Sequence, residues 1–322
     1  MRAMLCHRHG GVEVLEPGQL PDPVPAADEV VIDVRACGLN FPDVLMIAGK
    51  YQVQPPLPFA PGAEVAGVIA SCGSAVTALS PGQRVLAYCG HGGLAEKVRV
   101  PAAQVLAIPD TMPFEEAAAF LLTFGTSWHA LKQRAALQPG ETLLVLGAAG
   151  GVGLAAVALG RLVGARVLAV ASSAEKRALV SAHGAHEVRD YDDLRGSIAE
   201  FTGGKGIDVV FDPVGGPLFE QALRSCAWNG RALVIGFASG EIPKIPMNLP
   251  LLKGASIVGV FWGSFVGREP GAADENHREL LEHYAAGRLQ VHVGASYPLA
   301  QAAEGLALLS GRGAMGKVVI TL

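Results

Sequence analysis

The chain has 322 residues, of which half are hydrophobic and 17% are charged, so it is long enough for two folded domains and too apolar to be disordered. The formal net charge of −4 gives no electrostatic basis for binding nucleic acid or an anionic membrane. Five scattered cysteines without a CxxC pair, and a start that lacks the apolar core of a secretion signal, predict free thiols and a cytoplasmic protein.

The first third of the chain predicts short strands separated by turns. Runs rich in β-branched residues span residues 30–34, 65–70 and 84–87, and a Pro-Gly pair precedes the second and the third. The prolines of segment 55–58 require an extended loop. Because helical periodicity is rare here, we expect a β-rich, barrel-like domain.

From about residue 113 onward, helices and strands are predicted to alternate. A helix is expected to begin at 115–119, and a Pro-Gly pair at 139–140 precedes a new unit. This alternation is typical of a parallel sheet with helices on both faces. We predict strands at 143–146, 166–170, 209–212, 232–235, 256–261 and 317–322, and helices at 152–163, 174–182, 217–226 and 279–286.

A glycine-rich turn separates the strand at 143–146 from the helix at 152–163. Residues 143–160 are uncharged and about as long as a minimal membrane span, but the glycines at their centre favour a buried strand, a turn and a buried helix. In this context glycine lets the backbone approach a pyrophosphate, and the helix N-terminus offers unpaired N–H groups. The spacing is GxxGxxG, and a tightly packed turn without a ligand is the alternative. We predict that a dinucleotide binds at Gly147, Ala149, Gly150, Gly151, Val152 and Gly153.

The end of the strand at 166–170 indicates which dinucleotide binds. Enzymes that use NAD usually have an acidic residue there, which holds the ribose 2′-hydroxyl. Here two serines follow, and Glu175 is expected to form a capping box with Ser172. Ser172, Ser173 and Lys176 are then left to bind a 2′-phosphate, which favours NADPH; the alternative is that Lys176 is an ordinary surface lysine.

Further motifs occur in an order that identifies a family. They are CGLNFPD (37–43), PFAPGAEVAG (58–67), DPVGG (212–216), VIGFASG (234–240) and GRGAMGKVV (311–319). With the glycine turn, they resemble the medium-chain dehydrogenase/reductase superfamily over nearly the whole chain, and within it the quinone oxidoreductase (zeta-crystallin-like) branch. The resemblance implies an α/β protein with two domains: a β-rich GroES-like catalytic domain at 1–122, completed by 263–322, and a doubly wound Rossmann domain at 123–262 that binds NADPH.

The zinc-dependent members of this superfamily bind their metal through a Cys before a Ser/Thr-Asp pair and a His in a Gly-His-Glu motif. This chain has Asn40 and Ala63 at those positions and lacks the four-cysteine lobe of the structural zinc site. Cys37, and Cys89 with His91, are expected to be packing or loop residues. We therefore expect no metal. Without a Lewis acid, the substrate should be electrophilic through its own conjugation, as a quinone or a conjugated carbonyl compound is.

The resemblance also implies the residues of the active site. Asn40, Asp43 and Tyr51 would line the cleft, with Asn40 donating an N–H to the acceptor oxygen and Tyr51 binding the substrate or relaying a proton. The alternatives are a turn-stabilising role for Asn40 and simple packing for Tyr51. Thr123 would approach the nicotinamide amide. The remaining cofactor positions implied are Gly236, Phe237, Phe261 and Trp262 at the nicotinamide ribose, and Tyr191 and Arg312 at the 2′-phosphate.

The leading expectation is therefore a zinc-independent, NADPH-dependent quinone oxidoreductase that acts on a small molecule. Two alternatives stay open: an NADPH-dependent reductase of activated C=C bonds in alkenals, enones or acrylates, and a non-enzymatic NADPH-binding protein of crystallin-like or RNA-associated type. The absence of a Lys/Arg cluster counts against RNA. A homodimer is expected through an apolar edge strand at 257–261, because an exposed strand edge pairs readily with its twin.

Overall fold

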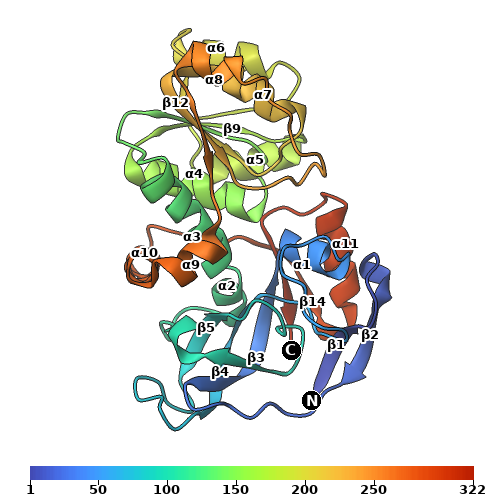
Figure 1. Cartoon of the computed structure of the whole chain (residues 1–322). Coiled ribbons are helices and arrows are strands. Elements are labelled where there is room, and N and C mark those ends of the chain that lie inside the picture. The colour runs from blue at the N-terminus through green and yellow to red at the C-terminus, as the bar shows by residue number, and fades with distance from the viewer. The chain divides into compact units, whose positions relative to one another are not determined.

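The computed structural model describes all 322 residues, which form two compact units (Figure 1). The first unit comprises Met1–Leu122 and Val291–Leu322, and the second comprises Thr123–Gln290. The chain therefore leaves the first unit after Leu122 and returns to it at Val291. No helix combines the length and the hydropathy that a membrane span requires.

The first unit is built around a seven-stranded, mainly antiparallel sheet in the order β14-β15-β3-β4-β5-β7, with β6 paired to β3, while β1 and β2 form a separate ribbon. The strands are β1 (Arg2–Cys6), β2 (Leu15–Gln19), β3 (Glu29–Leu39), β4 (Glu64–Cys72), β5 (Arg84–Tyr88), β6 (Lys97–Pro101), β7 (Val105–Ala107), β14 (Val293–Pro298) and β15 (Lys317–Thr321). The helices are α1 (Phe41–Ile47), α2 (Phe114–Ala118) and α11 (Ala302–Ser310), with short 3-10 turns at Val12–Val14, Ala102–Gln104 and Leu299–Gln301.

The long strand β3 organises the core of this unit. Val30, Ile32 and Val34 point to one face, as alternate residues of a strand do, and all three belong to the main hydrophobic core. The same strand pairs with β4 along nearly its whole length, with β6 along its first half and with β15 near its end. The C-terminal strand is thus an integral part of the sheet.

The second unit contains a six-stranded parallel sheet in the order β10-β9-β8-β11-β12-β13. The strands are β8 (Thr142–Val145), β9 (Arg166–Val170), β10 (Glu187–Arg189), β11 (Ile207–Asp212), β12 (Cys226–Val234) and β13 (Ser256–Gly259). The first strand, β8, is central, and the order reverses between β8 and β11, which is the doubly wound arrangement predicted from the sequence. The helices are α4 (Gly151–Val163), α5 (Ala174–Ala182), α6 (Leu194–Thr202), α7 (Pro217–Arg224), α8 (Asn248–Lys253), α9 (Trp262–Arg268) and α10 (Pro270–Ala285). Helix α3 (Leu121–His129) begins with the last two residues of the first unit, lies otherwise in the second, and continues into a π-helical turn (Ala130–Arg134).

Residues 263–290, which the family resemblance implied for the first domain, lie within the second unit. Their helix α10 is bonded to the end of α3 and the turn that follows it. The indole Nε1 of Trp128 donates to Glu279 at 2.9 Å, and the side chains of Gln133 and Asn276 exchange hydrogen bonds of 2.9 and 3.2 Å. These contacts explain why the chain returns to the first unit only after α10.

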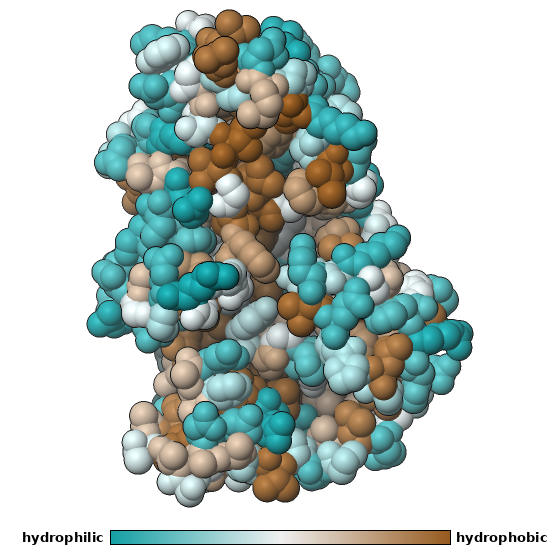
Figure 2. Space-filling model, viewed as in Figure 1, coloured by the Kyte–Doolittle hydropathy of each residue, from teal (hydrophilic) through white to brown (hydrophobic).

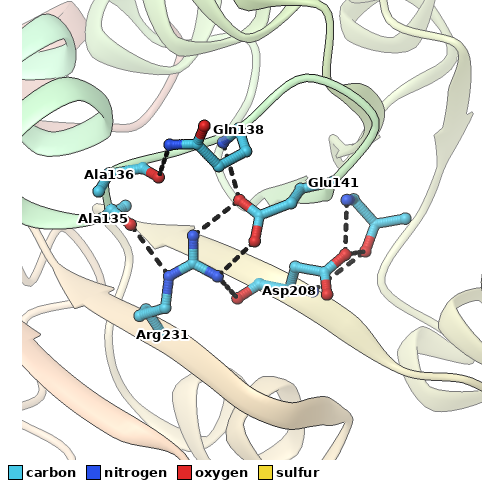
Figure 3. Close-up of polar contacts among 7 residues, drawn as sticks. Ala135, Ala136, Gln138, Glu141, Asp208 and Arg231 are labelled. Atoms are coloured by element: carbon cyan, nitrogen blue, oxygen red, sulfur yellow. Dashed lines mark hydrogen bonds and ion pairs between the residues drawn. The ribbon is translucent and has the colours of Figure 1, made fainter.

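Charged side chains tie the amino-terminal ends of β8 and β11 to β12 (Figure 3). Arg231 of β12 forms a bidentate ion pair with Glu141, with two N–O distances of 2.7 Å, and its Nε donates to the carbonyl oxygen of Ala135 at 3.0 Å. Asp208 accepts two hydrogen bonds from Thr142, both of 2.7 Å. This network holds the sheet at the end opposite its carboxyl edge.

Candidate functional site

The glycine-rich turn joins β8 to α4 at the point where the strand order reverses, outside the carboxyl ends of the strands, where such sheets bind ligands. Gly147 has a φ of +58°, a left-handed conformation that favours glycine. A Cβ on Gly153 would lie 2.4 Å from the carbonyl oxygen of Gly147, whereas a Cβ on Gly150 would meet only that same oxygen, at 3.5 Å. Gly153 is therefore required for packing within the turn, while Gly150 borders open space.

Helix α4 begins without a side-chain cap, because its N-cap residue is Gly150. The first N–H groups of a helix have no partner within it, and its N-terminus attracts negative charge. An uncapped 13-residue helix next to an open glycine fits the pyrophosphate of the dinucleotide expected from the sequence. The hydroxyl of Ser127 on α3, which the sequence analysis did not single out, donates to the carbonyl oxygen of Val152 at 2.9 Å and anchors the start of α4.

Tyr191 supports the glycine turn. Its hydroxyl oxygen accepts the N–H of Gly147 at 3.0 Å, and the hydroxyl donates to the carbonyl oxygen of Val170 at 3.4 Å. The side chain thereby joins the carboxyl ends of β8 and β9. Burial raises the pKa of the Tyr191 phenol, so it stays protonated and able to donate.

At the end of β9, Ser173 rather than Ser172 caps the next helix. Its Oγ accepts the backbone N–H of Lys176 at 3.2 Å. The capping box predicted for Ser172 and Glu175 is therefore wrong, because α5 begins at Ala174 and the cap position falls one residue later. Both serines are exposed and Lys176 is half-buried.

A second cation, Arg177, lies at the same strand end. Its Nη1 donates to the carbonyl oxygen of Ser172 at 3.2 Å and lies 3.9 Å from a carboxylate oxygen of Asp190. The residue after β9 is Ala171, so no carboxylate follows the strand directly. The sequence analysis did not single out Arg177. The only feature of the sequence that could have pointed to it is its position directly after Lys176.

The residues expected near the nicotinamide ribose follow β12 and β13. Gly236 and Phe237 come just after β12, and the N–H of Gly236 donates to the carbonyl oxygen of Asp212 at 3.4 Å. Phe261, the N-cap residue of α9, is 56% exposed. Trp262 is buried instead: a Cβ on Gly125 would lie 2.8 Å from its Nε1, so the indole packs against α3.

Asp212, at the carboxyl end of β11, shapes the loop of the DPVGG motif. Its buried carboxylate accepts the N–H groups of Val214 at 2.6 Å and of Gly215 at 3.0 Å. Burial raises the pKa of Asp212, and these backbone bonds oppose the rise. The sequence analysis used this motif only for the family resemblance.

In the first unit, Asn40 belongs to a buried polar cluster and is 5% exposed. Its Nδ2 donates to the carbonyl oxygen of Gly38 at 3.0 Å and to Oε2 of Glu64 at 3.3 Å, while its Oδ1 accepts from Nζ of Lys317 at 2.8 Å. Both amide protons have partners, so Asn40 would donate to a substrate only by giving one up. The geometry favours the structural alternative for this residue.

Glu64 and Lys317, both buried, form an ion pair of 3.1 Å that the sequence analysis did not find. Nζ of Lys317 also donates to the carbonyl oxygen of Leu39 at 3.0 Å, and Oε1 of Glu64 accepts the N–H of Leu122 at 2.8 Å. A buried pair is stable only when its remaining donors and acceptors are satisfied in this way.

Asp43, which is fully buried, closes a loop onto the start of α1. Its carboxylate accepts the N–H of Asn40 at 2.7 Å and of Gly62 at 3.2 Å. Burial raises the pKa of Asp43 to about 6 although these bonds favour the charged form. Tyr51 is half-buried against the core, and burial together with Asp43 raises the pKa of its phenol.

The two remaining predicted residues lie in different units. Thr123 is buried on α3 as the first residue of the second unit, and Arg312 is an exposed residue of the first unit with a φ of +58°. At the two positions where the family resemblance implied the zinc ligands of other members, this chain has the hydrogen-bonded amide of Asn40 and the buried methyl group of Ala63. No group of three or more His, Cys, Asp or Glu side chains is arranged to hold a metal ion.

Two protein-family models match the chain. The alcohol dehydrogenase GroES-like domain matches residues 26–110, within the first unit, and the zinc-binding dehydrogenase model matches residues 151–278, within the second. With the doubly wound sheet, these matches confirm the predicted combination of a GroES-like and a Rossmann domain.

Individual proteins resemble the chain over nearly its whole length. A quinone oxidoreductase-like protein 2 homolog of Nematostella vectensis is 40% identical over 324 residues, which cover 99% of this chain and 88% of that protein. The quinone oxidoreductase of Thermus thermophilus, solved alone and in complex with NADPH, is 38% identical with a TM-score of 0.88 and full coverage of both chains (100%). The enoyl reductase CurK is 28% identical with a TM-score of 0.89, covering 99% of this chain and 98% of its own. This chain belongs to the medium-chain dehydrogenase/reductase superfamily, in its quinone oxidoreductase branch.

Proposed function

We propose that this protein transfers a hydride from NADPH to a quinone or a related conjugated carbonyl compound, without zinc. The observation that carries the proposal is the glycine-rich turn at the point where the strand order reverses. There Gly150, which has free space beside it, precedes the uncapped N-terminus of α4. The Thermus thermophilus relative, named a quinone oxidoreductase and solved with NADPH, supports both the cofactor and the substrate class.

On the cofactor side, NADPH would supply the hydride, and the chain would bind and orient it. The N–H groups of the first turn of α4 would hold the pyrophosphate. Ser172, Ser173 and Lys176 at the end of β9 would meet the 2′-phosphate, and no carboxylate follows the strand directly to repel it. Tyr191 and Arg312 are proposed for the same phosphate. Phe261, Gly236 and Phe237 would border the nicotinamide ribose.

On the acceptor side, the oxygen that gains negative charge needs a donor. We propose Tyr51, which is half-buried at the edge of the core of the first unit and whose O–H group is protonated at neutral pH, as that of any tyrosine is. Asn40 and Asp43 would shape the pocket, and Thr123 would contact the nicotinamide amide. A conjugated acceptor spreads the incoming charge over its own π system, so the loss of zinc ligands at Asn40 and Ala63 is compatible with this chemistry.

The test is steady-state kinetics with NADPH and NADH against panels of quinones and of enones or acrylates, before and after prolonged chelation. We expect quinones to be reduced, NADPH to exceed NADH about ten-fold or more in kcat/KM, and chelation to change nothing. Activity lost together with a stoichiometric metal would refute zinc independence. Turnover of enones alone would instead identify a C=C reductase, the second candidate, which the likeness to an enoyl reductase favours.

Two variants extend this test to the 2′-phosphate. Lys176→Ala should raise KM for NADPH and leave NADH almost unchanged, and Ala171→Asp should shift preference toward NADH because a carboxylate binds the ribose diol and repels the phosphate. Lys205→Ala, at an exposed lysine in the turn after α6, is the matched control and should change neither cofactor. Equal harm to both cofactors by Lys176→Ala would make it a structural lysine.

We also propose a homodimer through the edge strand β13. Ile257 on this strand is partly exposed, and α8, which directly precedes β13, carries Leu251 and Leu252 at 78% and 71% exposure. Figure 2 shows hydrophobic residues at the surface of the second unit around α8. An apolar edge and an apolar patch of this kind favour self-association.

For the dimer, Ile257→Lys should place a charge on the shared edge and raise the dimer dissociation constant about ten-fold or more. Sedimentation velocity across a concentration series measures it. Val24→Lys, at an exposed valine of the first unit, is the control and should stay dimeric. A wild type that is monomeric at all concentrations would remove the proposal.

The cysteines bear on the proposed cytoplasmic location. All five are free, and three of them, Cys6, Cys37 and Cys226, are buried. Burial raises the pKa of each buried thiol. Free, protonated thiols are compatible with a reducing compartment.

A further inference from the structure

The chain crosses from one unit to the other at two points. The residues of one buried ion pair, Glu64 and Lys317, form a hydrogen bond beside each of these points. At the first point, the N–H of Leu122, the last residue of this part of the first unit, donates to Oε1 of Glu64 at 2.8 Å. At the second, the backbone N–H of Lys317 donates to the carbonyl oxygen of His292, one residue after the return at Val291, at 2.9 Å. The side chains of Glu64 and Lys317 join the two places through their 3.1 Å ion pair.

Burial and complete bonding make this pair a rigid link. The side-chain exposures are 0% for Glu64 and 5% for Lys317. The ammonium of Lys317 has three acceptors: Glu64, the side chain of Asn40 and the carbonyl oxygen of Leu39. Both oxygens of Glu64 are engaged, so its carboxylate cannot turn without leaving a buried donor unpaired, which costs more in a low-dielectric interior than in water.

The carboxylate of Glu64 acts on the first turn of α3, which begins at Leu121. The first N–H groups of a helix have no intrahelical partner, and an acceptor with negative charge satisfies and stabilises them. Here that acceptor comes from the first residue of a distant strand, β4. The next residue on α3 is Thr123, for which we propose contact with the nicotinamide amide.

We infer that Glu64, oriented by Lys317, is a positioning residue that holds the first turn of α3 and thereby places Thr123 for hydride transfer. The effect on turnover rests on the proposed function, whereas the hold on the N–H of Leu122 does not. If Glu64 only stabilised the fold, turnover would follow the folded fraction of the protein. The exchange rate of the Leu122 amide would then not depend on whether the side chain at position 64 offers an acceptor oxygen.

The test compares two charge-free double variants of the full chain. Glu64→Gln/Lys317→Met keeps a carbonyl oxygen for the N–H of Leu122, and Glu64→Leu/Lys317→Met removes it at similar volume. Thermal unfolding verifies the fold, and amide hydrogen exchange is measured at Leu122 and Thr123. Fluorescence titration gives the Kd for NADPH, and kinetics with a quinone give kcat and KM. If the leucine variant fails to fold, Glu64→Ala/Lys317→Met takes its place.

We expect the leucine variant to exchange the Leu122 amide about ten-fold or more faster and to lose about 10- to 100-fold in kcat, because small misplacements of reacting groups carry such costs. Its Kd for NADPH should change by less than about three-fold, since the glycine turn is untouched. The glutamine variant should stay near wild type in both respects. The matched control, Glu141→Leu/Arg231→Met, removes the ion pair of Figure 3 and should leave exchange at Leu122 unchanged.

Each contrary result has a distinct meaning. Wild-type exchange at Leu122 in a folded leucine variant would show that Glu64 does not hold α3, and faster exchange with wild-type kcat would show that the hold has no part in turnover. Equal loss of kcat in both double variants would overturn the role of the acceptor oxygen. If none of the quinones supports NADPH oxidation by the wild type, the proposed function fails. The difference in amide exchange between the two double variants would still decide whether Glu64 holds the helix.

Discussion

A Lys317→Met variant should lose about 3–5 kcal/mol of unfolding free energy. Glu64 is fully buried, and its only ion-pair partner is Lys317, so the substitution would leave a carboxylate in the interior without a counter-charge. The carbonyl oxygen of Leu39 and the side chain of Asn40 would lose their donor as well. Urea denaturation at neutral pH measures the change.

Two controls separate charge burial from a general effect of removing a cation. Glu64→Gln/Lys317→Met should recover much of the loss, because neither charge then stays buried. Arg2→Met breaks a pair with Glu96 in which the arginine is largely exposed, and such surface pairs contribute little, so its effect should be below about 1 kcal/mol. A loss of that small size in Lys317→Met would mean that water reaches Glu64.

Gly153→Ala should abolish tight NADPH binding, raising Kd about 100-fold or more. Its Cβ would lie 2.4 Å from the carbonyl oxygen of Gly147 and 2.7 Å from Cα of Ala148. Both are backbone atoms, so the turn itself must move, and its N–H groups would no longer converge on the pyrophosphate. Fluorescence titration with NADPH and a thermal melt measure the two consequences, and we expect a lower Tm as well.

Gly150→Ala is the matched control within the same turn. Its Cβ would meet only one atom within 4 Å, at 3.5 Å, and Gly150 has an ordinary φ of −79°. The Tm should therefore stay near wild type, while NADPH binding weakens if the ligand occupies the space beside this glycine. Tight binding in Gly153→Ala would show that the turn can relax without losing its phosphate site.

Local sequence predicted the second unit well because its signals lie within short segments. The strand at 166–170 and the helix at 174–182 coincide with β9 and α5. Where signals conflict, the boundaries move: α10 begins at Pro270, earlier than expected, because proline is well tolerated at the start of a helix. The helix predicted to Cys226 ends at Arg224, and that cysteine begins β12.

The site was less predictable wherever it depends on contacts between distant residues. Glu64 and Lys317 are separated by 253 positions, and no periodicity links a glutamate at the start of one strand to a lysine at the start of another. For the same reason the sequence left the amide of Asn40 free to serve a substrate, whereas the fold surrounds it with partners. The glycine turn was predictable because strand, turn and helix are contiguous.

The first unit is assembled from two separate stretches of the chain, and this sets the order in which the protein is completed on the ribosome. Thr123–Gln290 is contiguous and can fold once it has emerged, whereas β3 gains its neighbour β15 only after the final strand has been made. Contacts of such long sequence separation form slowly. We therefore expect the second unit to be complete during synthesis while the sheet of the first unit still lacks β15, so that part of β3 keeps an open edge and Glu64 has no ion-pair partner until Lys317 has been added.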